Sequence, residues 1–258
     1  MSAANRWIRA LLRSRPVRGI FESLLDDYRD RHDSSVAVAV RATLVNQTPG
    51  DYLEFGVHTG SSFIRAMQVY DRDRARIHAW PDFRGVDPAS LPAPMRFFAF
   101  DAFDRGFPEP TGPDASPLKP VHWTAGGMLT REEDFLASCR AAGLDPERFH
   151  VFGGYFEDTL SEAIRAQHAI ECAAVAHFDC DLYASTRTAL AFCTPLTHVG
   201  SVFVFDDYFR FRGSEHHGQV HAFAEWREAN PGFGFRELTR YRANSVAFIC
   251  SRAPEGKD

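Results

Sequence analysis

The sequence from Ala173 to Phe209 reads AAVAHFDCDLYASTRTALAFCTPLTHVGSVFVFDDYF and contains two short apolar runs, residues 173–176 and 201–205. A helix-like segment extends between them, from Ser185 to about Leu196. Two short buried strands that flank a helix are typical of a parallel crossover unit. The stretch therefore predicts an α/β fold built on a parallel sheet.

Both apolar runs lead into acidic residues. Asp179 and Asp181 follow the first run, and Asp206 and Asp207 follow the second. Open parallel sheets bind ligands just beyond the carboxyl ends of their strands, so we expect these carboxylates to meet at one site. Crowded acids repel one another unless a cation lies among them, and oxygen ligands favour Mg²⁺, Mn²⁺ or Ca²⁺ over zinc.

Two features of this acidic region have plainer interpretations. The four acids could simply cap the helices that follow the two strands, although their number and proximity favour a cation site. An extended backbone places Asp179 and Asp181 on one side and the residue between them on the other. Cys180 is therefore predicted to be a buried spacer and not a ligand.

The segments before and after this stretch extend the same pattern. Residues 51–56 read as a strand that runs into a glycine turn, and a helix is predicted from Phe63 to about Tyr70, followed by a long loop over residues 71–95. Residues 233–238 and 245–250 predict a closing antiparallel hairpin. Further strands are predicted at 96–100 and 149–153, and further helices at 16–46, 130–142, 158–167 and 219–228, with Thr130 and Glu133 as a capping box.

Composition limits the classes of protein that remain. A chain of 258 residues with 45% hydrophobic content can bury one sizeable core. The net charge of −5 argues against a nucleic-acid surface. No apolar run approaches the roughly 20 residues of a membrane span, and the five cysteines form no CxxC pair. We therefore expect a cytoplasmic protein without nucleic-acid or membrane partners.

The turn after the first strand carries the pattern E-x-G-x-x-x-G, formed by Glu54, Gly56 and Gly60. Glycines let the backbone approach a ligand closely, and the helix that follows presents its N-terminal amides. The pattern differs from the G-x-G-x-x-G of dinucleotide sites, and a plain tight turn is an equal alternative. Asp101 ends the second strand, where an acid can bind ribose hydroxyls or cap a helix.

Other side chains near the predicted site are less specific. His216, His217 and His221 follow the second acidic pair, and one of them could act as a general base, although solvated loop histidines are as good an explanation. Tyr155 and Phe156 follow the third strand, where an adenine ring could stack.

Five motifs occur in order between about Pro49 and Phe223, and together they are far more specific than any one of them. They are DYLEFGV from Asp51, FDAF from Phe100, GYFEDTL from Gly154, DCDLYAST from Asp179 and DDY from Asp206. In this respect the chain resembles the macrocin O-methyltransferase family. The resemblance implies a class I S-adenosylmethionine-dependent fold, with a Rossmann-like, doubly wound, mostly parallel sheet, and a Mg²⁺-assisted O-methyl transfer.

The resemblance also implies roles for individual residues. The metal ligands would be Asp179, Asp206 and Asp207, with Mn²⁺ as an alternative ion to Mg²⁺. Asp179, Asp181 and His217 would serve catalysis, the proton passing to Asp181 or to a nearby histidine. The cofactor S-adenosylmethionine would contact Glu54, Gly56, Gly60, Ser61, Asp101, Tyr155 and Asp179.

The resemblance divides the chain into an N-terminal helical arm or lid (residues 1–48), a methyltransferase domain (49–252) and a disordered tail (253–258). The acceptor is expected to be a small molecule with a hydroxyl group, such as a natural-product sugar or phenol. An N-terminal helical arm is compatible with a homodimer. Two alternatives are a metal-dependent glycosyltransferase that uses an Asp-x-Asp site, and a partner protein that has kept the fold without its chemistry.

Overall fold

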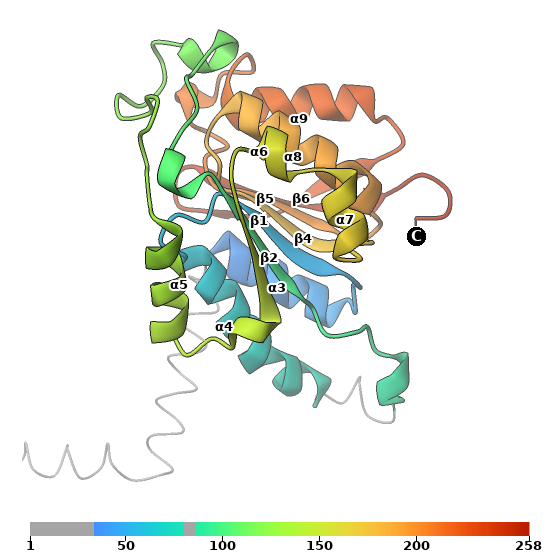
Figure 1. The fold of residues 1–258 in the computed structure, drawn as a ribbon. Coiled ribbons are helices and arrows are strands. Elements are labelled where there is room, and N and C mark those ends of the chain that lie inside the picture. Colours follow the sequence, from blue (N-terminus) through green and yellow to red (C-terminus); the bar gives the residue numbers. More distant parts are fainter. Residues whose placement is uncertain (1–33, 80–85, 258) are drawn as a thin grey trace, which may run out of the picture. The chain divides into compact units, whose positions relative to one another are not determined.

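The computed structural model describes residues 34–79 and 86–257 (Figure 1). The helices predicted before residue 34, and with them most of the predicted arm, lie outside the described residues. The described residues from Ser35 onward belong to one compact unit, which includes the helix Ser35–Val45 (α3).

The sheet has seven strands in the order β3-β2-β1-β4-β5-β7-β6. Strands β1 to β5 are parallel to one another. Strand β7 is antiparallel to both β5 and β6, so the predicted hairpin is confirmed. The strands are β1 Asp51–Phe55, β2 Phe97–Asp101, β3 Phe149–Gly153, β4 Ala173–Phe178, β5 Val202–Phe205, β6 Gly234–Tyr241 and β7 Ser245–Arg252.

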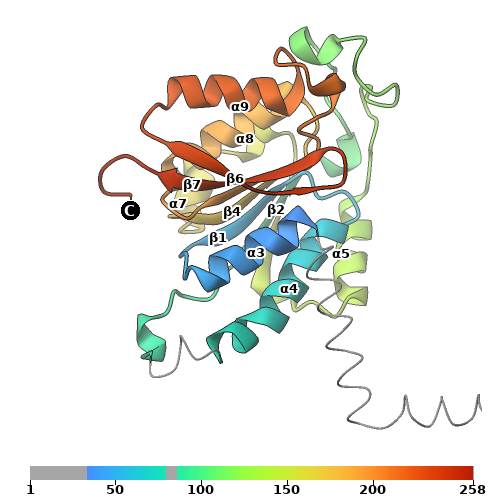
Figure 2. The same ribbon diagram turned by 180° about the vertical axis from the view of Figure 1, so that it is seen from behind.

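Helices cover both faces of the sheet (Figures 1 and 2). One face carries α3, α4 (Ser61–His78) and α5 (Glu132–Ala141), and the other carries α6 (Phe156–Thr159), α7 (Glu162–Gln167), α8 (Tyr183–Cys193) and α9 (Gly218–Ala229). Parallel strands covered on both faces are apolar throughout rather than alternating, which explains why β4 is buried at every position. In the described part of the chain, none of the helices combines the length and hydropathy that crossing a bilayer requires.

A buried acid joins two helices of the first face. Asp73 of α4 is 2% exposed, and its carboxylate accepts hydrogen bonds from Nε of Arg41 on α3 at 2.7 Å and from Nε of Arg72 at 2.7 Å. Burial acts to raise the pKa of Asp73, but the two guanidinium groups outweigh it and lower the pKa below its ordinary value. The carboxylate is therefore ionised and links α3 to α4.

Several predicted boundaries differ from the structure. Helix α4 continues to His78, so the first part of the region predicted as a loop is helical. Helix α5 has Arg131 as its N-cap with no side-chain hydrogen bond, and the capping box predicted from Thr130 and Glu133 does not form. The helix predicted over residues 158–167 is two short helices, the second of which is capped by Ser161.

The final residues also differ from their predicted disorder. The backbone N–H of Val199 donates to the carbonyl of Lys257 at 3.0 Å. The ammonium group of Lys257 donates in turn to the carbonyls of Thr194 and Pro195, at 3.1 and 2.8 Å. Residues 253–257 thus fold back onto the end of α8.

A row of stacked phenylalanine rings crosses the five parallel strands. Neighbouring rings are in register across the sheet, with centroids 4.8 to 5.4 Å apart and planes inclined by 13° to 18°. From β3 to β5 the rings belong to Phe152, Phe100, Phe55, Phe178 and Phe205. Four of these phenylalanines directly precede Asp101, Gly56, Asp179 and Asp206 in the sequence. The row therefore forms the floor beneath the carboxyl ends of the strands.

Candidate functional site

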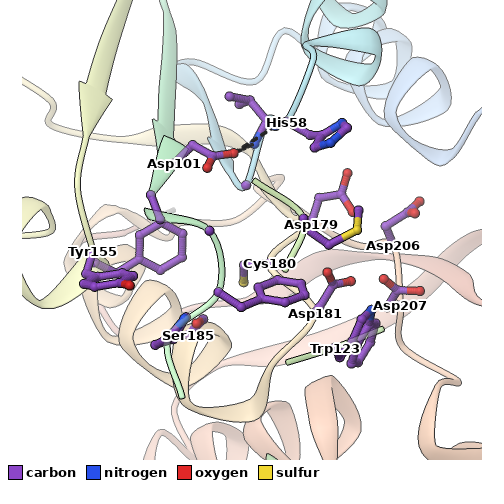
Figure 3. A pocket seen from close by; sticks show the side chains of 18 of the residues that line it. His58, Asp101, Trp123, Tyr155, Asp179, Cys180, Asp181, Ser185, Asp206 and Asp207 are labelled. Atoms are coloured by element: carbon purple, nitrogen blue, oxygen red, sulfur yellow. Dashed lines mark hydrogen bonds between the residues drawn. The ribbon is translucent and has the colours of Figure 1, made fainter. Parts of the chain in front are cut away.

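A cavity of about 300 Å³ opens at the carboxyl ends of the parallel strands. Its size is that of a small-molecule site, and its position is the one that open parallel sheets use for ligands. The strand ends contribute Gly56, Asp101, Asp179 and Asp206 to its wall. Figure 3 shows the four aspartates of the two acidic pairs on one side of the cavity and Asp101 and Tyr155 on the other.

The acidic side of the cavity contains a compact group of carboxylates. One oxygen each from Asp179, Asp181 and Asp207 lies within 4.8 Å of the others. Asp206 also lines the cavity but does not belong to this group. The sequence thus predicted correctly that the two acidic pairs converge. The predicted metal ligands were Asp179, Asp206 and Asp207, whereas the compact group in the structure contains Asp181 in place of Asp206.

Loss of hydration raises the pKa of Asp179, Asp181 and Asp206. Burial is the main reason why the pKa values of Asp179 and Asp181 lie well above their ordinary range, and why that of Asp206 is raised. The neighbouring charge and hydrogen bond of Asp207 raise the pKa of Asp181 further. The carboxylates are therefore costly to ionise together without a cation among them.

The residues present fit a hard divalent cation. The group offers only carboxylate oxygens, which Mg²⁺ and Mn²⁺ accept and which do not favour zinc. Among the described residues that line the cavity, Arg210 is the one arginine or lysine, and its Nε donates to Asp207 at 2.7 Å. A single guanidinium leaves the acidic wall with an excess of negative charge.

A strained turn directs Asp181 toward the other acids. Its φ is +61°, and the N–H of Leu182 donates to the carbonyl of Cys180 at 2.6 Å, which closes a tight turn around it. A γ-turn with positive φ is rare for residues other than glycine. The predicted extended backbone is therefore wrong here, although Cys180 is buried as expected, with its sulfur 3.5 Å from Oγ1 of Thr186.

On the opposite side, Asp101 binds the turn between β1 and α4. Its Oδ2 accepts hydrogen bonds from the N–H groups of Val57 at 2.7 Å and His58 at 2.8 Å, and its Oδ1 accepts from Phe103 at 2.8 Å. The bond to His58 is drawn in Figure 3. Three of about four acceptor positions of the carboxylate are thus occupied by backbone groups.

Two residues of the predicted cofactor motif do not lie on the cavity wall. Glu54 is fully buried and accepts hydrogen bonds from the hydroxyls of Tyr52 and Ser62, the latter at 2.5 Å. Gly60 is the N-cap of α4, with φ of +87°, and packs against Phe135. Ser62 and the predicted Ser61 do line the cavity, so Glu54 reaches it only through Ser62.

The buried Glu54 also faces His177, whose Nδ1 lies 3.4 Å from its Oε2. Burial acts to lower the pKa of His177, but the Glu54 carboxylate outweighs it, and the pKa is raised to about 9. Nε2 of His177 has no hydrogen-bond partner among the described residues. The His177 and Glu54 side chains thus lie in contact with each other, just before the carboxyl end of β4.

The structure separates the remaining predicted residues. Tyr155 lines the cavity, and the guanidinium of Arg105 lies over its ring, 5.2 Å from the centroid. His217 is not on the cavity wall, because its ring stacks on Phe211 and its Nδ1 is 2.8 Å from Oγ of Ser214. The geometry thus favours Asp181 over His217 as a base.

A long loop, residues 102–131, closes over the acidic side. Trp123, which is 2% exposed, packs against Phe107 of the same loop and against Phe211 and Leu182. Asp114 anchors the loop to the start of α8, because its carboxylate accepts hydrogen bonds from the N–H groups of Tyr183 at 2.6 Å and Ala184 at 3.0 Å.

Sequence reasoning missed two residues that hold the site together, Asp114 and Gln219. Asp114 is an N-cap supplied from 69 positions away, so the local signal for a cap is absent. Gln219 lies in the first turn of α9, and its side chain contacts the backbone of Phe178 and Asp207. Neither position belongs to a recognisable motif, and only the tertiary fold shows their partners.

Solved structures share this fold. "Structure of the O-methyltransferase NovP" superposes with a TM-score of 0.62 at 24% identity, over 84% of this chain and 78% of that one. "Crystal Structure of CalS11, Calicheamicin Methyltransferase" gives a TM-score of 0.58 at 21% identity, over 95% and 90% of the two chains. No curated protein matches the chain in sequence.

The family model of the macrocin O-methyltransferases (TylF) matches residues 29–231, which is most of the chain. The match includes the acidic side of the cavity, the turn after β1 and the long loop. A match to a methyltransferase family argues against both alternatives, a glycosyltransferase and a partner protein without catalytic activity. The chain therefore belongs to the macrocin O-methyltransferase family and is an O-methyltransferase.

Proposed function

We propose that the protein transfers a methyl group from S-adenosylmethionine to a hydroxyl of a small molecule, with the help of Mg²⁺ or Mn²⁺. A natural-product sugar or phenol is the proposed acceptor. The observation that carries the proposal is the group of Asp179, Asp181 and Asp207 on the wall of the cavity at the strand ends. The calicheamicin methyltransferase among the similar folds supports a natural product as the acceptor class.

The metal would be held by Asp179 and Asp207 of the compact group. Asp206, which also lines the cavity, would be the third carboxylate, because Asp181 would serve as the base. When bound, S-adenosylmethionine supplies the methyl group, and a divalent ion lowers the pKa of the acceptor hydroxyl and neutralises the acids around it. Arg210 orients Asp207 through its hydrogen bond. The strand ends fix the backbone of Asp179 and Asp206, whose N–H groups donate to Phe55 and Phe178 at 2.9 and 3.1 Å.

Asp181 would accept the proton of the acceptor hydroxyl. Burial raises the pKa of Asp181 above its ordinary value, and a carboxylate with a raised pKa is a stronger base than an ordinary aspartate. The turn around Asp181 holds the carboxylate beside those of Asp179 and Asp207. A fixed position of this kind supports the near-attack geometry on which transfer between two bound molecules depends.

The cofactor would occupy the side of the cavity formed by the β1–α4 turn and α6. Gly56, Ser61, Asp101 and Tyr155 line that side. Asp101 retains about one acceptor position for a ribose hydroxyl, since its other positions bind backbone N–H groups. Tyr155 presents an aromatic ring at the start of α6, where an adenine could pack.

The acceptor would enter between the acids and the long loop. Trp123 and Met128 line the cavity there. Met128 is 47% exposed, and Val121 and Leu129, which adjoin the lining residues His122 and Met128 in the sequence, are exposed by 92% and 50%. Apolar side chains at the edge of a cavity commonly mark a binding surface. They suit the uncharged body of an acceptor, while the acids bind its hydroxyl end.

Calorimetry tests the proposal with four titrations: S-adenosylmethionine and a nucleotide sugar, each with and without Mg²⁺. We expect binding of S-adenosylmethionine only. In Asp179→Ala, metal-dependent transfer to a sugar or phenol acceptor should disappear while cofactor binding is largely kept. An equal loss of cofactor binding would show that Asp179 is structural, and binding of the nucleotide sugar alone would refute the proposal.

A further inference from the structure

The side chain of Gln219 bridges the two turns that carry the acids. It is 1% exposed and lies in the first turn of α9. Its Nε2 donates to the carbonyl of Phe178 at 2.9 Å, and its Oε1 accepts from the N–H of Asp207 at 3.1 Å. Phe178 directly precedes Asp179, so one amide side chain joins the backbone beside one proposed metal ligand to the backbone of another.

The Gln219 bridge lies beyond the last backbone hydrogen bond between β4 and β5, where the sheet no longer fixes the distance between the two segments. The last bond of the β4–β5 ladder runs from the N–H of Asp206 to the carbonyl of Phe178. Beyond this bond, the segments that follow β4 and β5 enter separate turns. The N–H of Asp207 therefore does not bond to a backbone carbonyl of β4. Gln219 supplies that partner and ties it to the same Phe178 carbonyl.

A primary amide satisfies both groups. The carbonyl of Phe178, which already accepts from Asp206, can accept a second donor, and the N–H of Asp207 requires an acceptor. The two ends of the glutamine amide provide one of each. A glutamate would place a carboxylate oxygen against the Phe178 carbonyl. A methionine would fill the same space but leave the buried Asp207 N–H without its partner.

Helix α9 does not need this bridge to dock on the sheet. Ala222, Phe223 and Trp226 are buried on its inner side, and Nε1 of Trp226 donates to Oγ1 of Thr194 at 2.8 Å. Gln219 therefore contributes something that the apolar face and the Trp226 bond do not, namely a fixed link between the two acidic turns.

We propose that Gln219 is a positioning residue: it sets the separation of the Asp179 and Asp207 carboxylates and thereby the affinity of the site for a divalent cation. The inference rests on the proposed function, because it requires that these acids bind a metal. Residues that orient metal ligands from behind typically change metal affinity by about 10-fold to 100-fold when they are removed.

The test measures Mg²⁺ binding to Gln219→Met by titration calorimetry, together with the melting temperature and the affinity for S-adenosylhomocysteine. We expect Mg²⁺ affinity to fall by about 10-fold or more, while the affinity for S-adenosylhomocysteine is kept. Thr194→Val is the matched control, because it removes the side-chain acceptor of Trp226, a hydrogen bond that also fixes α9 but lies away from the acids. It should lower the melting temperature without weakening Mg²⁺ binding.

Gln219→Glu separates positioning from simple electrostatics. An added negative charge near the acids would by itself tighten Mg²⁺ binding, whereas repulsion from the Phe178 carbonyl spreads the turns and weakens it. The inference is overturned if Gln219→Glu binds Mg²⁺ as tightly as the wild type, or if Gln219→Met loses only thermal stability, as Thr194→Val does. If the wild type binds S-adenosylhomocysteine but no Mg²⁺, the metal part of the proposed function fails and this inference fails with it.

Discussion

Gly56 lies directly against the backbone of Asp179, so close that a Cβ at position 56 would overlap the Asp179 carbonyl group, with its carbon 2.8 Å away. The φ of Gly56 is +89°, a conformation that side chains disfavour. The glycine therefore allows the ends of β1 and β4 to approach each other. This approach places the cofactor side and the acidic side of the cavity next to one another.

Gly56→Ala should destabilise the fold by about 2 kcal/mol or more, because it adds steric overlap to an unfavourable φ. Gly143→Ala is the matched control: Gly143 also has positive φ, at +76°, but nothing lies within 4 Å of its would-be Cβ. Urea unfolding of both variants measures the difference. Equal losses in the two would show that the contact with Asp179 adds nothing.

Asp114→Ala should detach the long loop from the start of α8. Removal of a helix cap costs about 1 to 2 kcal/mol, and the N–H groups of Tyr183 and Ala184 then lose their partner. We expect a lower melting temperature and a higher KM for the acceptor. Asp145→Ala removes a cap in an exposed turn and should change neither KM nor kcat. An unchanged KM in Asp114→Ala would contradict the role of the loop in acceptor binding.

Asp181→Asn should lower kcat by about 10²-fold to 10⁴-fold, the usual contribution of a general base. The amide retains the shape of the carboxyl group and cannot accept the proton, so the affinity for S-adenosylhomocysteine should be unchanged. His217→Asn provides the comparison, since His217 stacks on Phe211 and does not line the cavity. A larger loss of kcat in His217→Asn than in Asp181→Asn would reverse the assignment.

Asp73→Asn should lower the free energy of unfolding at pH 7 by about 2 kcal/mol, less than for a fully buried pair because both arginines retain some solvent. The folded-state pKa of Asp73 is lowered, so its stabilisation is complete above the ordinary value of 3.8 and is lost as the pH falls through the folded-state value. The difference between variant and wild type should therefore shrink in acid.

Denaturant titrations at several pH values measure this effect. Glu237→Gln is the control, since its pair with Arg240 is exposed on β6, and no measurable change is expected there. A difference for Asp73→Asn that stays constant down to pH 3 would mean that the charge of Asp73 does not stabilise the fold.

The sequence predicted the strands and their acidic ends because those signals are local. Apolar runs such as residues 201–205 are short, and the residue after each run is read directly. The convergence of Asp179 with Asp207 then follows from parallel topology alone. Boundaries were less accurate where a helix had competing signals, as in α4, where charged residues after Tyr70 suggested a loop but pack as an amphipathic helix.

What the sequence could not predict depends on contacts between distant residues. The positive φ of Asp181 places it beside Asp207, which an extended model of residues 179–181 does not foresee. Gln219 and Asp114 act on backbone groups 41 and 69 positions away. Burial of Glu54 beneath the cavity likewise depends on its neighbours Tyr52 and His177 and not on its place in a motif.

The row of phenylalanine rings from Phe152 to Phe205 has a consequence for how the site tolerates change. Each inner ring contacts a ring on either side, so a smaller side chain at Phe55 would remove one stacking contact from Phe100 and one from Phe178. The resulting gap would disturb the backbone at Gly56 and at Asp179, which follow Phe55 and Phe178 on two different strands. Substitutions in the loop above the cavity are therefore accommodated more easily than substitutions in the row of rings beneath it.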